Sequence, residues 1–199
     1  MTTDVAIIAN GGANIASLRI ALDRLGASSE LTSDPAALRR APRVILPGVG
    51  AAADAMDRLR ALNLVELIRT LPQPVLGICL GMQLLFESSE EGETSCLGVI
   101  PARVRKFPTR DGLPVPHMGW NRLTPRCQSP LLRGLDDAPH MYFVHSYAAP
   151  VGPSTLATSE YGAEFSAVVQ CRNFLGTQFH PERSSRAGSR VLANFLELQ

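Results

Sequence analysis

Short apolar runs that alternate with helical patterns restrict the fold of this sequence more than any other feature. The runs are "VAIIA" (5–9), "RVILPG" (43–48) and "PVLGI" (74–78). Their lengths and apolar residues are typical of buried strands. Residues 14–25 show apolar positions at helical spacing, and residues 51–70 and 80–87 each predict one further helix. Strands that alternate with helices predict a parallel sheet covered on both faces.

The second half of the chain has a different pattern, in which proline and glycine become frequent. Residues 28–32 are a candidate edge strand, and residues 184–199 predict a closing helix. Strands joined by turns are predicted over residues 99–107, 141–147, 165–171 and 174–179. We therefore expect a single domain over residues 1–199 with an α/β fold: three layers, a mostly parallel central sheet with helices on both faces, and antiparallel strands in the second half.

The charge balance and the cysteine spacing argue against several classes of function. Lys and Arg number 19 against 18 Asp and Glu, whereas nucleic acid and membrane surfaces select a basic excess. No apolar stretch reaches the length of a membrane span, and Met1–Asp4 lacks the basic start of a signal peptide. We therefore expect a cytoplasmic location. The 4 cysteines form no CxxC pair, which disfavours a zinc site.

Cys79 lies at a predicted strand-to-helix junction, between Gly77 and Gly81 in "GICLG". This spacing is typical of a nucleophile elbow, in which a sharp turn exposes the nucleophile at the end of the sheet. A helix N-terminus at this point would favour the thiolate, and the N–H of Leu80 would be available to an oxyanion. The alternative is a buried structural cysteine at a strand end.

The segment "QFHPER" (178–183) offers a base for that nucleophile. Pro181 favours an extended conformation at His180, and in an extended segment residues two apart face the same side. We therefore expect Glu182 to contact His180 and to complete a triad with Cys79. Arg183 would then face away from the triad. The alternative for His180 is an ordinary histidine in a surface loop.

A third element is "LPGVG" (46–50), which follows a predicted buried strand. Its glycines allow a peptide group to lie very close to a substrate or to change its orientation. At the carboxyl end of a parallel strand, the segment belongs in the ligand crevice. The alternative is an ordinary turn.

Together these elements resemble the class I, or triad, glutamine amidotransferases. "PHMGWN" (116–121), "YFVHSY" (142–147) and "LGVIPARVRKF" (97–107) are similar to the glutaminase subunits of bacterial imidazole glycerol phosphate synthases. The resemblance implies hydrolysis of L-glutamine to L-glutamate and ammonia, without a cofactor or metal. It also implies a heterodimer with a (β/α)8-barrel cyclase/synthase subunit, which uses the ammonia in histidine biosynthesis. No nucleic acid or membrane partner is implied.

The resemblance also implies roles for individual residues. Cys79 would form a glutamyl thioester, His180 would protonate the leaving ammonia and then activate water, and Glu182 would hold the imidazole. Oxyanion donors would come from the N–H groups of Leu80 and of the loop Gly48, Val49 and Gly50. Substrate contacts are implied for Gln83, His145, Ser146 and Tyr147, and partner contacts for Asn14, Trp120, Tyr142 and Arg183. For Trp120 the alternative is a packed core side chain, beside a buried, hydrogen-bonded His117.

The sequence departs from the family pattern at a few positions outside the expected triad. Ala13 stands where the family has a glycine, and Ala52 follows the "PGVG" segment where a bulky aromatic residue is usual. Arg183 and Ser185 replace a lysine and a glutamine. These departures bear on contacts with a partner subunit rather than on the chemistry.

Three rival functions are open at this point. The first is another glutaminase of the superfamily, such as the one serving pyridoxal phosphate synthesis, which "PHMGWN" and "PGVG" disfavour. The second is a protease-like cysteine hydrolase, which would lack the "QFHPE" segment. The third is a catalytically silent subunit that only supports a synthase, and the intact Cys79, His180 and Glu182 disfavour it.

Overall fold

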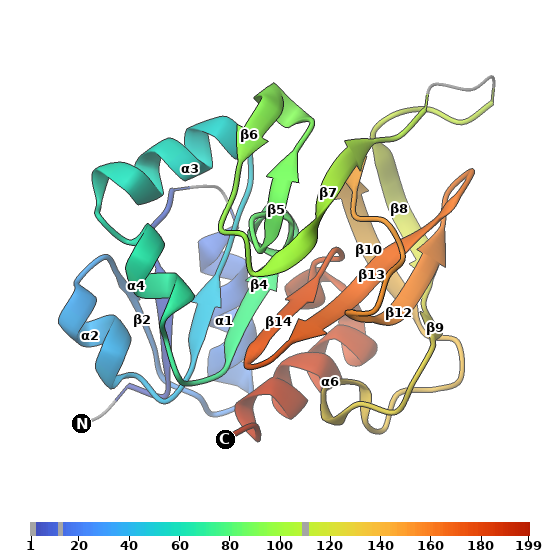
Figure 1. The fold of residues 1–199 in the computed structure, drawn as a ribbon. Coiled ribbons are helices and arrows are strands. Elements are labelled where there is room, and N and C mark those ends of the chain that lie inside the picture. Colours follow the sequence, from blue (N-terminus) through green and yellow to red (C-terminus); the bar gives the residue numbers. More distant parts are fainter. Residues whose placement is uncertain (1–2, 12–13, 109–111) are drawn as a thin grey trace.

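The computed structural model describes residues 3–11, 14–108 and 112–199, so that Ala13 lies outside the described residues. Its central sheet has eight strands in the order β2-β1-β3-β4-β14-β13-β12-β9 (Figure 1). The first five of these are parallel neighbours, and the remaining pairings are antiparallel. The strands are β1 (Val5–Ile8), β2 (Ser29–Thr32), β3 (Val44–Leu46), β4 (Val75–Ile78), β9 (Thr124–Pro125), β12 (Thr155–Glu160), β13 (Glu164–Cys171) and β14 (Phe174–Thr177).

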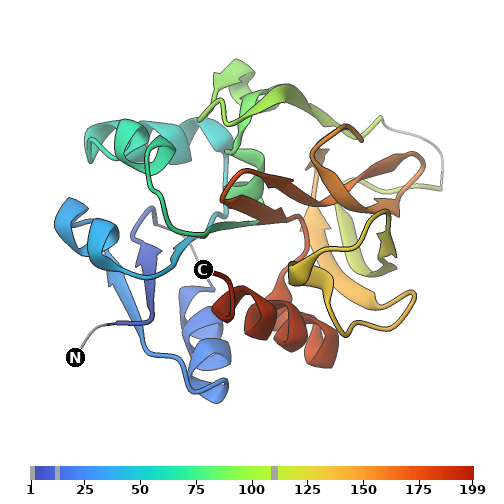
Figure 2. The same ribbon diagram turned by 60° about the horizontal axis from the view of Figure 1, so that its bottom comes forward.

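Helices cover both faces of this sheet, because its buried strands present apolar side chains in both directions. In β1, Ala6 and Ile8 pack into one core, whereas Val5 and Ile7 pack into the other. Figure 2 shows the blue α1 and the red α6 on one side of the sheet and the teal α3 on the other. The helices on the first core are α2 (Pro35–Arg40), α3 (Ala52–Ala61) and α4 (Val65–Arg69), and those on the second are α1 (Ile15–Arg24) and α6 (Ser185–Leu196). The predicted fold class is confirmed.

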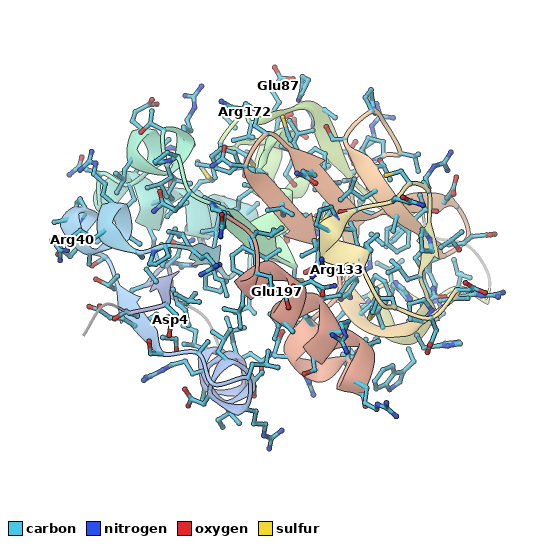
Figure 3. All side chains as sticks on the ribbon, turned by 90° about the horizontal axis from the view of Figure 1, so that it is seen from below. Asp4, Arg40, Glu87, Arg133, Arg172 and Glu197 are labelled. Carbon is cyan, nitrogen blue, oxygen red and sulfur yellow. The ribbon has the colours of Figure 1, made fainter. Side chains whose placement is uncertain are left out.

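Two smaller sheets extend the second half of the chain. One has the order β11-β7-β5-β6 and the other pairs β10 with β8. Their strands are β5 (Phe86–Ser89), β6 (Thr94–Ser95), β7 (Ile100–Lys106), β8 (His117–Arg122), β10 (His140–His145) and β11 (Tyr147–Ala148). Short helices complete the chain: α5 (Leu80–Gln83), η1 (Glu91–Glu93), η2 (Pro130–Leu132) and η3 (Pro181–Arg183). Beside η2, Arg133 forms an exposed ion pair with Glu197 after α6 (Figure 3).

The prediction of one helix over residues 51–70 is wrong, because the chain forms α3 and α4 there. The break lies at Asn63, whose φ of 55° is left-handed. Asparagine tolerates this conformation better than most residues, and it ends the helix. The N–H of Leu64 then reaches back to the carbonyl of Leu59 at 2.9 Å and starts the second helix at a new angle.

The prediction of a helix over residues 80–87 is also wrong beyond its first turn. α5 ends at Gln83, and Phe86 begins β5, where it pairs with Ile100 of β7. Pairing with a distant strand overrides the local helical pattern. A one-turn helix has a weak dipole. It therefore stabilises a thiolate at Cys79 less than the predicted helix over residues 80–87 would.

Within the described part of the chain, no helix is long and apolar enough to cross a membrane.

Candidate active site

Two adjacent parallel strands bring the predicted nucleophile and base together. β4 and β14 lie side by side, with Ile78 paired to Thr177. Cys79 follows β4 directly, and its N–H donates to the carbonyl of Thr177 at 2.8 Å. His180 comes shortly after the end of β14, at the same edge of the sheet. The carboxyl ends of neighbouring parallel strands meet at one crevice, which is why residues about a hundred positions apart share a site.

The backbone at Cys79 has a conformation that L-residues rarely adopt, with φ 54° and ψ −112°. Such strain is typical of a nucleophile elbow. The flanking glycines are needed because backbone segments touch here. A Cβ on Gly81 would lie 1.9 Å from the carbonyl oxygen of Leu46, and one on Gly77 would lie 2.6 Å from the carbonyl oxygen of Gly81. Gly48 packs equally closely, since its Cβ would lie 2.5 Å from the nitrogen of Gly81.

A cavity of about 470 Å³ opens at this elbow. Its volume is in the range typical of small-molecule sites. Most of the residues predicted for catalysis, oxyanion binding and substrate binding line it: Cys79, His180, Leu80, Val49, Gly50, Gln83, His145, Ser146 and Tyr147. Gly48 and Glu182 line a small adjoining cavity, together with Asn14. The structure thus brings together residues from five separate stretches of the sequence.

Glu182 contacts His180 as predicted, but the local backbone differs from the prediction. The Nδ1 atom of His180 lies 2.9 Å from Oε1 of Glu182. His180 itself is extended, whereas Pro181–Arg183 form the 3-10 helix η3 rather than continuing as a strand. Proline at the first helical position favours this turn. The Glu182 side chain is only 3% exposed, so water does not compete for the imidazole.

Asn14 also belongs to this cluster. From the sequence, Asn14 was expected only at a partner surface, so its contact with Glu182 was not predicted. Its amide Nδ2 donates to Oε1 of Glu182, and its backbone is left-handed with φ 85°. The side chain therefore holds the carboxylate instead of capping its own helix. Oε2 of Glu182 has no hydrogen-bond partner in the described part of the chain. Both known contacts of the carboxylate thus pass through a single oxygen.

Arg183 does not point away from the site, and this prediction is wrong. It lines the main cavity, and its guanidinium lies 4.9 Å from the centre of the Tyr142 ring. The cause is η3, which turns the side chain by about a third of a helical turn instead of alternating it across a strand. The side chain is nevertheless exposed.

Opposing effects act on the imidazole of His180. Burial disfavours its charged form, but hydrogen bonds to Cys79 and Glu182, together with the charges of both groups, favour it. These contacts outweigh burial and raise the pKa of His180 from 6.5 to about 10. His180 therefore keeps its proton at neutral pH and loses it as the pH rises through about 10.

The two other histidines near the site form a buried neutral pair. Nδ1 of His145 lies 2.7 Å from the carbonyl oxygen of Tyr147, so it must carry a proton. Nε2 of His145 then accepts from Nδ1 of His117 at 3.0 Å, and Nε2 of His117 accepts from the amide of Asn121 at 3.2 Å. Burial lowers the pKa of His145 to about 3 and that of His117 to about 4. The buried, hydrogen-bonded alternative for His117 is therefore correct.

For Trp120, by contrast, the alternative of a packed core side chain is wrong. It is 54% exposed, and Met118 on the same face of β8 is 64% exposed. Across the strand pair, the Tyr142 ring packs against Trp120 at a centroid distance of 5.9 Å. These side chains, together with Arg183, form an exposed apolar and cationic face beside the cavity. Apolar faces of this kind mark interaction sites more often than isolated apolar residues do.

Comparisons with known proteins agree with this geometry. The family model "Glutamine amidotransferase class-I" matches residues 6–198. The imidazole glycerol phosphate synthase subunit HisH of Xanthomonas axonopodis pv. citri is 56% identical over 98% of both chains. The protein of the same name from Xylella fastidiosa (strain Temecula1) is 52% identical over the same shares.

Solved structures resemble the chain over nearly its whole length. The structure of PurLQS from Thermotoga maritima matches with a TM-score of 0.74 at 18% identity, covering 98% of each chain. A crystal structure of a glutamine amidotransferase matches with a TM-score of 0.74 at 21% identity, covering 98% of this chain and 97% of that one. At these identities the likeness concerns the fold.

Proposed function

The chain belongs to the class I glutamine amidotransferase family, and we propose that it is the glutaminase subunit of an imidazole glycerol phosphate synthase in histidine biosynthesis. The observation that carries this proposal is the 56% identity to a subunit of that synthase over 98% of both chains. The cavity at the Cys79 elbow supports it, because a nucleophile, a base and a carboxylate converge there. We place the protein in the cytoplasm, without a cofactor.

The reaction begins with the sulfur of Cys79 attacking the side-chain amide carbon of L-glutamine. A C–S bond forms, the C–N bond breaks, and His180 gives its proton to the departing nitrogen, so that ammonia leaves and a glutamyl thioester remains. Water then attacks the thioester, and His180 takes a proton from it. The C–S bond breaks, L-glutamate leaves, and the thiolate of Cys79 is restored beside the protonated His180. Glu182 holds the imidazole in orientation throughout.

Backbone groups would stabilise the charge that develops on the substrate oxygen. The N–H of Leu80 has no intrahelical partner, because Leu80 is the first residue of α5. A second donor would come from the loop of Gly48, Val49 and Gly50, which borders the elbow. Gly50 has a φ of 87°. Because glycine has no Cβ and populates both signs of φ, a change of peptide orientation in this loop would meet no steric penalty at this residue.

Other polar residues that line the cavity would hold the α-amino and α-carboxylate groups of glutamine. Gln83 lines the cavity, and so do His145, Ser146 and Tyr147. The His145 ring is engaged by Tyr147 and His117, so that His145 would contribute backbone groups.

The partner would be a (β/α)8-barrel cyclase subunit that docks over the cavity and receives ammonia directly. The exposed face of Met118, Trp120, Tyr142 and Arg183 supports this placement, because it adjoins the cavity that holds Cys79. Asn14 lies at the same opening, where it contacts both the cavity and Glu182.

The proposal is tested by co-purifying the chain with the cyclase subunit of its own organism and measuring glutamate release. We expect a stable complex, with turnover that rises when the cyclase and its nucleotide substrate are both present. If the complex is intact but releases no glutamate under any condition, the chain is instead a catalytically silent subunit that only supports the synthase.

The charge of Glu182 should set the alkaline limit of the glutaminase reaction. An opposite charge within about 4–6 Å raises the pKa of an imidazole by roughly 1–3 units. Glu182→Gln removes that charge from His180, so the proton needed by the leaving ammonia is lost at lower pH. We expect the alkaline limb of kcat/KM for glutamine to move down by about one pH unit or more.

The matched control is Glu164→Gln, which removes a carboxylate from an exposed pair with Arg126. It should leave the pH profile of the complex unchanged. A Glu182→Gln profile that coincides with the wild-type profile would show that the carboxylate does not act on His180.

Reversal of the charge at Arg183 should weaken assembly. The guanidinium is held over Tyr142 at the proposed docking face, where it is ready to pair with an acidic group of the partner. We expect Arg183→Glu to weaken the complex by roughly tenfold or more, because a mispaired interfacial charge is costly. Calorimetric titration with the cyclase subunit measures this effect.

Arg172→Glu is the matched control, since Arg172 is also stacked on an aromatic ring, 5.5 Å from the centre of Phe174, but on another part of the surface. Its affinity for the partner should equal that of the wild type. Equal affinities for both variants would show that Arg183 is a solvated surface side chain with no role in assembly.

A further inference from the structure

At the wall of the cavity, two glutamine side chains form a hydrogen-bonded chain that ends at the sulfur of Cys79. The Nε2 atom of Gln83 lies 2.9 Å from the carbonyl oxygen of Tyr147 and 2.9 Å from Oε1 of Gln178. The Nε2 atom of Gln178 lies 3.7 Å from Sγ of Cys79. Gln178 is fully buried and Gln83 is 4% exposed, so water does not compete for these contacts. Gln178 has no role in the thioester mechanism proposed for Cys79, His180 and Glu182.

The direction of each hydrogen bond in this chain is fixed. The carbonyl of Tyr147 can only accept, so the Gln83 amide must present its NH2 group there. The same NH2 group faces Gln178, which must therefore offer its carbonyl oxygen. The remaining end of the Gln178 amide is its NH2 group, and this end faces the sulfur. Reversing either amide would place two acceptors or two donors against one another.

We propose that Gln178 is a further catalytic residue, whose amide N–H donates to the sulfur of Cys79 and favours the thiolate that attacks glutamine. The proposal rests on the glutaminase function assigned above. Gln83 then has two tasks, because it lines the substrate cavity and also locks the orientation of Gln178.

The contact strengthens as the sulfur becomes charged. In the neutral form, the S–H group has the carbonyl oxygen of Val144 within reach at 3.6 Å. On ionisation the sulfur can only accept, and the same carbonyl becomes an unfavourable neighbour. The N–H of Gln178 then forms a charge-assisted hydrogen bond, which is roughly twice as strong as a neutral one. A donor that gains strength with charge lowers the energy of the reactive form specifically.

The groups around the sulfur allow the effect of the Gln178 amide to be measured separately from that of the titratable side chains. The titratable and charged side chains that line the same cavity are His180, which precedes η3, Arg183 of η3, Glu91 of η1, His145 of β10 and Tyr147 of β11, with Glu182 behind His180. None of them hydrogen-bonds to Gln178 through its side chain in the described part of the chain. Gln178→Met keeps the length of the side chain and removes only the amide.

The test is the rate of Cys79 alkylation by iodoacetamide as a function of pH, read by mass spectrometry of the Cys79 peptide. Alkylation reports the thiolate. Removing the donor should slow the reaction of Gln178→Met by roughly tenfold to a hundredfold at pH values below the wild-type midpoint. The midpoint of the pH profile should rise by about one unit or more. Gln170→Met is the matched control, because its amide donates to the carbonyl of Arg172 near the surface, and its profile should equal that of the wild type.

An unchanged alkylation profile in a folded Gln178→Met protein would overturn the proposal, since a merely structural glutamine alters stability without moving the profile. If that variant does not fold, the wild-type protein supplies the measurement: the side-chain amide signals of Gln178 in an ¹⁵N spectrum should shift with the same midpoint as alkylation. Signals that stay fixed through that midpoint would equally overturn it. Alkylation requires no glutamine, so failure of glutamine turnover in the wild type would reject the proposed function and leave this result standing.

Discussion

Cys79→Ala should abolish glutamine-dependent turnover while leaving ammonia-dependent synthesis by the assembled complex intact. No other cysteine lines the cavity within the described residues, so no substitute nucleophile is at hand. Removal of the nucleophile from a comparable triad costs about six orders of magnitude in kcat. Glutamate release and product formation, each measured with glutamine and with an ammonium salt, separate the two activities.

Cys127→Ala is the matched control, because Cys127 is an exposed free cysteine on the segment after β9. It should retain full activity with either nitrogen source. Glutamine turnover that survives in Cys79→Ala would remove the thioester mechanism altogether.

Gly81→Ala should destabilise the fold more than any surface substitution, and it should inactivate the site as well. The new Cβ would lie 1.9 Å from the carbonyl oxygen of Leu46, which is backbone and cannot rotate away. Overpacking a core costs about 1–3 kcal/mol when side chains can adjust, and a clash with backbone lies at or above the top of that range. We expect a loss of more than about 3 kcal/mol in the free energy of unfolding, measured by urea denaturation.

Gly152→Ala supplies the comparison, since a Cβ there would meet no atom within 4 Å. It should leave the urea midpoint essentially unchanged. Equal midpoints for both variants would mean that the elbow and the "LPGVG" loop can move apart freely, which would contradict the close backbone contact between Gly81 and Leu46.

The strands of the parallel sheet could be predicted because each is a short apolar run whose burial does not depend on detail elsewhere. The convergence of Cys79 and His180 was also predictable once both were placed after strands, because carboxyl ends of parallel strands share one edge. The contact of His180 with Glu182 is confirmed for a different reason than predicted, since η3 rather than an extended segment brings the two side chains together.

Features that depend on distant partners could not be predicted from local pattern. The helix expected over residues 80–87 yields to β5 because Phe86 pairs with a strand formed later in the chain. The contact of Asn14 with Glu182 joins the first helix to the last turn before α6, and no spacing in the sequence indicates it. Gln178 stands in the "QFHPE" segment, but its role emerges only when Gln83 fixes the direction of its amide.

The most direct test of the account is to treat the wild-type complex with a diazoketone analogue of glutamine and to map the adduct among the 4 cysteines. Cys79 is only 7% exposed, whereas Cys127 is exposed. We predict a single adduct on Cys79 that excess glutamine prevents, because the binding of glutamine places the reactive carbon at the elbow sulfur. An adduct on Cys127 with Cys79 unmodified, or labelling that glutamine does not prevent, would contradict the assignment of Cys79 as the nucleophile.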